Sequence, residues 1–313
     1  MKIGIFDSGL GGLIIAKAIQ KAMPQYDYVY LGDTKRVPYG NRSHEAVFEF
    51  TKEGIDFLFK KENCAIVIVA CNTASARALR RIQQEYLVEY NATRKVMGES
   101  ERKILGVLIP TAEEAAKYKR VGILATTGTV NSNTFLTEIK KINLKRKKDL
   151  QNPLLVEEGA GGGDLKKNHL ALKGTPPQKG GENHFTTRVF QNSAPMLVPL
   201  IEEGEKELAF QFIKKYLKPF TTKKLDALVL GCTHYPFYKN EIKKVLGPKV
   251  KIISQDEIIP KKLKEYFAKH TEVSKKLSQK KTAKILVTDI TPRVKELSQK
   301  WFGKNTKVEL IRL

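Results

Sequence analysis

The stretch that decides the fold is Ile66-Val67-Ile68-Val69-Ala70-Cys71-Asn72-Thr73, a run of mostly β-branched residues that ends in a thiol, an amide and a hydroxyl. An apolar run of this length, closed by polar side chains, predicts a buried strand. A second stretch, Leu228-Val229-Leu230-Gly231-Cys232-Thr233-His234, follows the same plan. The sequence therefore places a cysteine at the carboxyl end of each of two similar strands.

The order of strand, turn and helix recurs along the chain. Apolar strands are predicted at residues 2–6, 28–31, 65–70, 104–109, 120–125, 227–230, 251–253, 284–287 and 307–311. Helical spacing is predicted at residues 13–23, 46–61, 74–90, 113–118, 203–216, 258–267 and 293–302. This alternation predicts an α/β fold of mostly parallel sheets flanked by helices, with the functional site at the carboxyl ends of the strands.

Composition narrows the class of protein. Hydrophobic residues make up 41% of the 313 residues, and no run approaches the ~20 apolar residues of a membrane-spanning helix. The amino-terminal strand turns polar at once, unlike a secretory signal, so we expect a cytoplasmic protein. Three cysteines without a C-x-x-C pair predict reduced thiols, with neither a disulfide framework nor structural zinc.

The net charge of +23 allows a nucleic-acid or other anionic partner. The excess is spread over residues 140–148, 214–224 and 261–281, however, and no helix-turn-helix, zinc-finger or RNP pattern accompanies it. Solvated helix faces are therefore the favoured interpretation, and nucleic-acid binding remains the alternative.

The glycine-rich turn Gly9-Leu10-Gly11-Gly12 after the first strand does not predict nucleotide binding. Position 14 is isoleucine where G-x-G-x-x-G requires glycine, and no G-x-x-x-x-G-K-[ST] loop occurs. The backbone amides of this turn, at a helix start, are candidates for holding a substrate carboxylate. Residues 151–187, rich in Gly, Lys, Asn and Pro, are predicted to form a mobile surface insertion.

The duplicated context of Cys71 and Cys232 favours chemistry over packing. A thiol beside backbone N–H groups at a helix start is expected to have a lowered pKa. Two such thiols facing one pocket suit a 1,1-proton transfer, in which a thiolate removes an α-proton and a thiol protonates the opposite face. Cys64 lacks this context and is interpreted as a small buried hydrophobe.

Two further side chains are candidates for assisting the thiols. Asp7 ends the first strand and is expected on the same sheet edge as Cys71, and His234 lies two residues beyond Cys232. The alternatives are that Asp7 only caps the following helix and that His234 is an ordinary loop histidine.

Several segments make the chain resemble glutamate racemase, of the aspartate/glutamate racemase superfamily. They are residues 6–12, 31–43, 70–76, 198–204 and 230–236, together with Thr288-Asp289 and the helix that follows. Pro38-Tyr39-Gly40 and Cys232-Thr233-His234-Tyr235-Pro236 are the most specific of them.

The resemblance implies two pseudo-symmetric α/β domains with the active site in the cleft between them. Their expected bounds are residues 1–103 with 257–313, and residues 104–256. It also implies interconversion of L- and D-glutamate without a cofactor or metal, a supply of D-glutamate for peptidoglycan, and a homodimer.

Carried over position by position, the resemblance makes Cys71 and Cys232 the acid and base, assisted by Asp7, His234 and Glu202. The substrate contacts that it implies are Asp7, Ser8, Tyr39, Gly40, Asn72, Thr73, Thr233 and His234, with Thr126 and Thr129 as weaker candidates.

The chain also departs from the family pattern. The 151–187 segment is long, Ala194-Pro195 replaces a Cys-Pro, and Ser254-Gln255-Asp256 replaces a Val-Asp-Ser. A racemase for aspartate or another acidic amino acid, and a basic nucleic-acid-binding protein on a racemase scaffold, remain alternatives.

Overall fold

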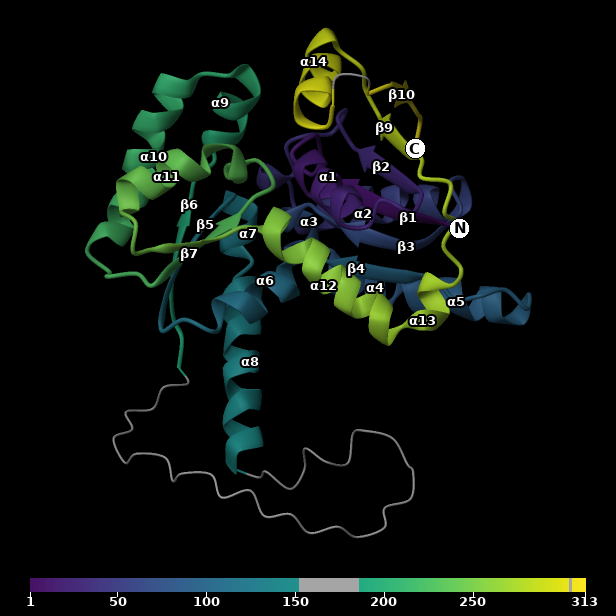
Figure 1. Cartoon of the computed structure of the whole chain (residues 1–313), viewed down its shortest axis with the longest axis horizontal. Coiled ribbons are helices and arrows are strands. Elements are labelled where there is room, and N and C mark those ends of the chain that lie inside the picture. The colour runs from purple at the N-terminus through teal and green to yellow at the C-terminus, as the bar shows by residue number, and fades with distance from the viewer. Residues whose placement is uncertain (152–185, 304–305) are drawn as a thin grey trace.

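The apolar strands form two sheets in a computed structural model, which describes residues 1–151, 186–303 and 306–313 (Figure 1). The first sheet has six strands in the order β10-β9-β2-β1-β3-β4. These are β1 (Lys2–Asp7), β2 (Tyr28–Gly32), β3 (Cys64–Val69), β4 (Lys103–Gly106), β9 (Ala283–Val287) and β10 (Val308–Leu310). The second has four strands in the order β6-β5-β7-β8. These are β5 (Arg120–Ala125), β6 (Arg188–Ser193), β7 (Ala227–Gly231) and β8 (Lys251–Ile253).

Helices cover both sheets. Around the first sheet are α1 (Leu13–Ala22), α2 (His44–Lys60), α3 (Asn72–Arg77), α4 (Leu79–Gln84), α5 (Tyr86–Val96), α13 (Thr271–Ser274) and α14 (Pro292–Trp301). Around the second are α7 (Thr127–Asn131), α8 (Thr134–Gln151), α9 (Leu197–Glu203), α10 (Lys206–Thr221) and α11 (Lys239–Leu246). Two helices, α6 (Leu108–Ala115) and α12 (Gln255–Lys269), lie between the two groups. Short 3₁₀ turns occur at η1 (Tyr39–Asn41) and η3 (Tyr235–Tyr238).

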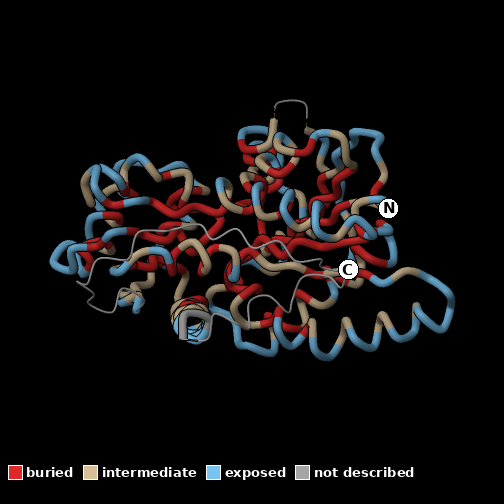
Figure 2. Tube along the Cα trace, turned by 60° about the horizontal axis from the view of Figure 1, so that its bottom comes forward, coloured by how far each residue is buried: buried red, intermediate tan, exposed pale blue. Residues whose placement is uncertain are grey.

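The observed pairing confirms the predicted α/β class. All strand pairs in the described ranges are parallel. Parallel sheets need apolar cover on both faces, which explains why β1, β3, β5 and β7 are almost wholly buried. Figure 2 shows these buried strands at the centre, with exposed positions on the surrounding helices and loops.

The predicted boundary at residue 104 is wrong for one strand. Residues 103–106 form β4, which pairs with β3 from Ile66↔Lys103 to Val69↔Gly106 and so belongs to the first sheet. The chain leaves that sheet only after Gly106, and α6 begins at Leu108. The apolar residues 107–109, predicted as strand, belong instead to the start of this helix. The second predicted boundary, at residue 257, falls inside α12.

The single helix predicted at residues 74–90 is also wrong. The helical backbone is distorted at Ala78 (φ −115°) and Glu85 (φ −101°, ψ −77°), which divides the segment into α3, α4 and α5. These bends keep Leu79 and Ile82 buried while α5 runs outward with no fully buried residue. Most of the predicted 151–187 insertion, residues 152–185, lies outside the described residues.

The fold brings the carboxyl edges of the two sheets together. Asp7 ends β1, Cys71 follows β3 by two residues, Thr126 follows β5 and Cys232 follows β7. Residues from the loops after these strands line one common cavity. The topology therefore supplies polar side chains from both sheets to one place.

One packing contact gives a test of the fold. A Cβ added at Gly54 on α2 would lie 2.3 Å from Cε2 of the buried Phe6 ring. Gly54→Ala should therefore lower the free energy of unfolding by about 1–3 kcal/mol through overpacking. Urea unfolding measures this, with Gly303→Ala as the control because its nearest neighbour would be 3.8 Å away. A gain in stability, as helix propensity alone would give, would contradict this packing.

Candidate active site

A cavity of about 280 Å³ lies between the carboxyl edges of the two sheets. Most of the predicted site residues line it: Ser8, Tyr39, Gly40, Cys71, Asn72, Thr73, Thr126, Glu202, Cys232, Thr233 and His234. Asp7 and Thr129 lie behind this lining. The structure thus brings together the residues that the sequence analysis selected, while their roles remain predictions.

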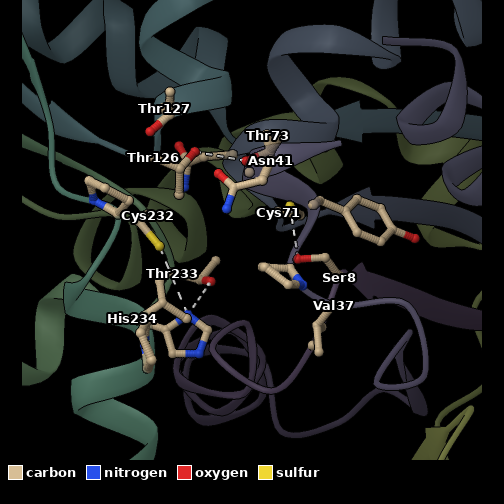
Figure 3. Close-up of a pocket in the computed structure, with 18 of the residues that line it drawn as sticks. Ser8, Val37, Asn41, Cys71, Thr73, Thr126, Thr127, Cys232, Thr233 and His234 are labelled. Carbon is tan, nitrogen blue, oxygen red and sulfur yellow. Dashed lines mark hydrogen bonds between the residues drawn. The ribbon is translucent and has the colours of Figure 1, made fainter. Parts of the chain in front are cut away.

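The two cysteines occupy opposite sides of the cavity (Figure 3). Cys71 caps α3, and its Sγ accepts a hydrogen bond from the Ala74 N–H at 3.4 Å. The same thiol donates to Ser8 Oγ at 3.2 Å. Cys71 and Cys232 are 5% and 6% exposed, so each thiol is largely shielded from solvent within the cavity wall.

The environment of Cys71 favours the neutral thiol. Burial raises its pKa to about 12, and the nearby charge of Asp7 acts in the same direction. The hydrogen bonds that Cys71 makes with Ser8 and with the Ala74 N–H oppose this rise only in part. The lowered pKa expected from the helix start is therefore wrong for Cys71, because desolvation outweighs the backbone amides.

Cys232 has a different partner. His234 Nδ1 lies 3.9 Å from its Sγ, and His234 Nε2 lies 2.8 Å from Oε1 of Glu202. Burial alone would lower the pKa of His234, but the hydrogen bonds and charges of Cys232 and Glu202 outweigh it and raise that pKa well above the ordinary value. These contacts favour the protonated imidazole of His234. His234 thus contacts both Cys232 and Glu202, and its assisting role stays a prediction.

Asp7 stabilises the turn that leads into α1, and its assistance to Cys71 stays a prediction. Its Oδ2 accepts hydrogen bonds from the N–H groups of Gly9 and Gly12 at 3.2 and 3.1 Å, which caps the turn into α1. Its Oδ1 is buried without a hydrogen-bond partner. Burial raises the pKa of Asp7, while the charge of His234 opposes the rise. A buried carboxyl with a free oxygen can still accept or release a proton.

The glycine turn after β1 has a role that the sequence analysis missed. A Cβ added at Gly11 would lie 2.4 Å from His234 Nδ1 and 2.5 Å from Thr233 Oγ1. The turn was expected to hold a carboxylate, but at Gly11 it packs against side chains that follow β7 in the other sheet. Only glycine allows this approach, because any side chain would displace the imidazole.

Three threonine hydroxyls connect the segment after β3 of the first sheet with the segment after β5 of the second sheet. Thr73 Oγ1 lies 2.9 Å from Thr126 Oγ1 and 3.4 Å from Thr129 Oγ1. Thr126 and Thr129 hydroxyls are 3.0 Å apart. Thr73 and Thr126 face the cavity in Figure 3 and can turn their hydroxyls toward an anion.

Two predicted contact residues have their side chains held by other groups. Asn72 and Gln255 exchange two amide hydrogen bonds of 2.8 and 2.6 Å, so Asn72 offers a ligand chiefly its backbone. The Tyr39 hydroxyl donates to buried Asp33 at 2.5 Å, which leaves its ring and backbone at the cavity. Asp33 and Gln255 were missed as supporting residues. An acidic residue directly after a buried strand was the available signal for Asp33.

The described ranges contain no cluster of three or more His, Cys, Asp or Glu side chains suited to a metal ion. Nor does any helix in this part of the chain have the length and apolar character needed to cross a membrane.

Comparison with known proteins identifies close relatives. The glutamate racemase of Aquifex pyrophilus is 33% identical, over 99% of this chain and 97% of its own. That of Chlorobaculum parvum is 32% identical over 99% and 95%. Among solved structures, a glutamate racemase isoform of Bacillus anthracis has a TM-score of 0.75 at 27% identity, over 100% and 97% of the two chains. The Aquifex pyrophilus enzyme has a TM-score of 0.69 at 31% identity, over 99% and 98%. No protein-family model matches the chain.

The unequal surroundings of the three thiols predict an order of alkylation. At neutral pH, iodoacetamide should modify Cys232 first because the His234 imidazole lies beside its Sγ, then Cys71, whose pKa is raised by burial, and Cys64 last because it is fully buried. Peptide mass spectrometry over a time course measures the three rates. His234→Asn should slow modification of Cys232 at least about tenfold and leave Cys71 nearly unchanged. Faster labelling of Cys71 than of Cys232 would refute the prediction that His234 makes Cys232 the more reactive thiol.

Proposed function

The chain belongs to the glutamate racemase family, and on that premise we propose that it interconverts L- and D-glutamate by proton transfer between Cys71 and Cys232. The observation that carries the proposal is the placement of the two thiols on opposite sides of one cavity, each with a different electrostatic partner. A racemase needs a base on one face of the α-carbon and an acid on the other, and both must change roles for the reverse reaction.

We assign the starting roles of Cys232 and Cys71 from the residues that surround each thiol. Cys232, whose Sγ lies 3.9 Å from Nδ1 of His234, is proposed as the base that removes the α-proton. Cys71, whose pKa is raised by burial, is the thiol that gives its proton to the opposite face of the carbanion. After one turnover Cys232 carries the proton and Cys71 carries the charge. The opposite enantiomer then reacts in the opposite direction.

Three residues assist this exchange. Glu202 accepts a hydrogen bond from His234 Nε2, which keeps Nδ1 directed at Cys232. Ser8 accepts a hydrogen bond from the Cys71 thiol and can reverse to stabilise its thiolate. Asp7 is buried behind Ser8 and Cys71. We propose that its charge balances that of His234 and that it influences how tightly Cys71 holds its proton.

The cavity suits a small dicarboxylic amino acid. Hydroxyls and backbone N–H groups at Ser8, Gly40, Thr73, Thr126 and Thr233 are proposed to bind the two carboxylates. Glu202 is the carboxylate of the lining that can face the substrate ammonium. The volume of about 280 Å³ is at the small end of ligand pockets and excludes a large cofactor beside the substrate.

The finer consequences of family membership are also proposals. We infer that the reaction needs no added cofactor or metal, that the D-glutamate serves peptidoglycan synthesis, and that the protein works as a cytoplasmic homodimer.

The first experiment is proton NMR of the purified protein with L-glutamate in D₂O, without added cofactor, followed by chiral analysis. Loss of the α-proton signal together with formation of D-glutamate is expected, because the protonating thiol carries solvent deuterium. Exchange of aspartate but not glutamate would transfer the proposal to a sister racemase. Silence with both substrates, from a folded protein with free thiols, would refute it and favour the binding-protein alternative.

Single thiol substitutions test the mechanism. Cys71→Ser and Cys232→Ser should each lower kcat at least about a thousandfold, because a hydroxyl is far too weak an acid and base for this step. Cys64→Ser is the matched control, since Cys64 is buried at the start of β3 and away from the cavity lining, and its kcat should stay within about twofold. Near-parental racemisation by either of the first two variants would rule out the two-thiol mechanism.

A further inference from the structure

Arg77, the last residue of α3, connects two segments that border the cavity. Its Nε donates a hydrogen bond of 3.0 Å to the carbonyl of Gly128 on α7. Its Nη1 donates to the carbonyl of Arg42, directly after η1. The η1 turn belongs to the first sheet's loops and α7 follows β5 of the second sheet. One guanidinium therefore joins the two halves of the molecule at the cavity wall.

The joined segments are in direct contact. A Cβ added at Gly128 would lie 2.8 Å from the Gly40 carbonyl oxygen and 3.1 Å from Arg77 Cζ. A Cβ added at Gly40 would lie 3.2 Å from Cβ of Thr126. Gly40 and Gly128 thus form a seam with no room for side chains, and Thr126 beside it faces the cavity (Figure 3).

The charge of Arg77 has no carboxylate to compensate it within the described parts of the chain. Burial is the cause that lowers its pKa, and no acidic side chain acts on it in the opposite sense. Its guanidinium still carries a full positive charge at neutral pH. Among the residues that the structure describes, no lysine or arginine lines the cavity. Arg77 is accordingly a nearby fixed cation for a substrate with two carboxylates.

We propose that Arg77 is a positioning residue that holds the Gly40 turn against α7 and so forms the wall that binds a substrate carboxylate. This role rests on the proposed function and adds a residue that contacts neither thiol. The planar guanidinium directs its donors toward two carbonyls at once, which the single ammonium of lysine cannot reproduce. The wall contacts the substrate in the ground state and the transition state alike, so its loss should weaken binding more than catalysis.

The test compares Arg77→Lys and Arg77→Gln with the parent in steady-state racemisation of L-glutamate. Both variants should raise KM about tenfold and keep kcat within about threefold. Gly128→Ala, which separates the same seam with Arg77 intact, should reproduce the rise in KM. Arg188→Gln is the matched control, because Arg188 is an exposed cation at the opposite end of β6 from the cavity.

Binding of glutarate, measured by calorimetry, separates this proposal from the proton-transfer mechanism. Glutarate has both carboxylates and no ammonium or reacting α-proton, so its Kd should rise with KM in the Arg77 variants even if the parent proves inactive as a racemase. Urea unfolding midpoints identify a variant that is merely unstable, in which case Gly128→Ala provides the test. Unchanged KM and glutarate Kd in both Arg77 variants, a loss confined to kcat, or an equal rise in Arg188→Gln would overturn the proposal.

Discussion

The site depends on one close approach, between the turn after β1 and the loop after β7. Gly11 packs where any side chain would collide with His234 and Thr233, so the imidazole of one half rests on the backbone of the other. This contact also brings His234 within electrostatic reach of Asp7. The remaining features of the cavity follow from it, because Cys71 and Cys232 belong to different sheets and face the same space only while these edges are in contact.

The two cysteines lie in similar stretches of sequence but have different neighbours in the folded chain. Cys71 is surrounded by a hydroxyl, one backbone amide and a buried carboxyl, and its proton is held tightly. Cys232 has a histidine supported by Glu202. A strictly symmetric site would give both thiols the same affinity for a proton, and neither would be poised as base while the other is acid. In the proposed mechanism, this departure from symmetry assigns the acid to one thiol and the base to the other.

The sequence predicted the sheets, the cysteines and most of the lining, because buried parallel strands and their polar carboxyl ends have strong local patterns. It could not predict that residues 103–106 stay in the first sheet, since an apolar strand does not reveal its partner. The breaks at Ala78 and Glu85 were also hidden, because helical spacing continues through them. Gln255 and Arg77 contact partners distant in sequence, and only the folded chain shows those contacts.

The tie between Asn72 and Gln255 at the back of the cavity is made of amides alone. Amides do not titrate in the range where thiols, imidazole and carboxyls exchange protons, and salt hardly screens them. In the proposed mechanism, the contact between α3 and α12 would therefore keep its dimensions while charge moves from one cysteine to the other. The residues proposed to change their charge are thus different from the amides that hold α3 and α12 together.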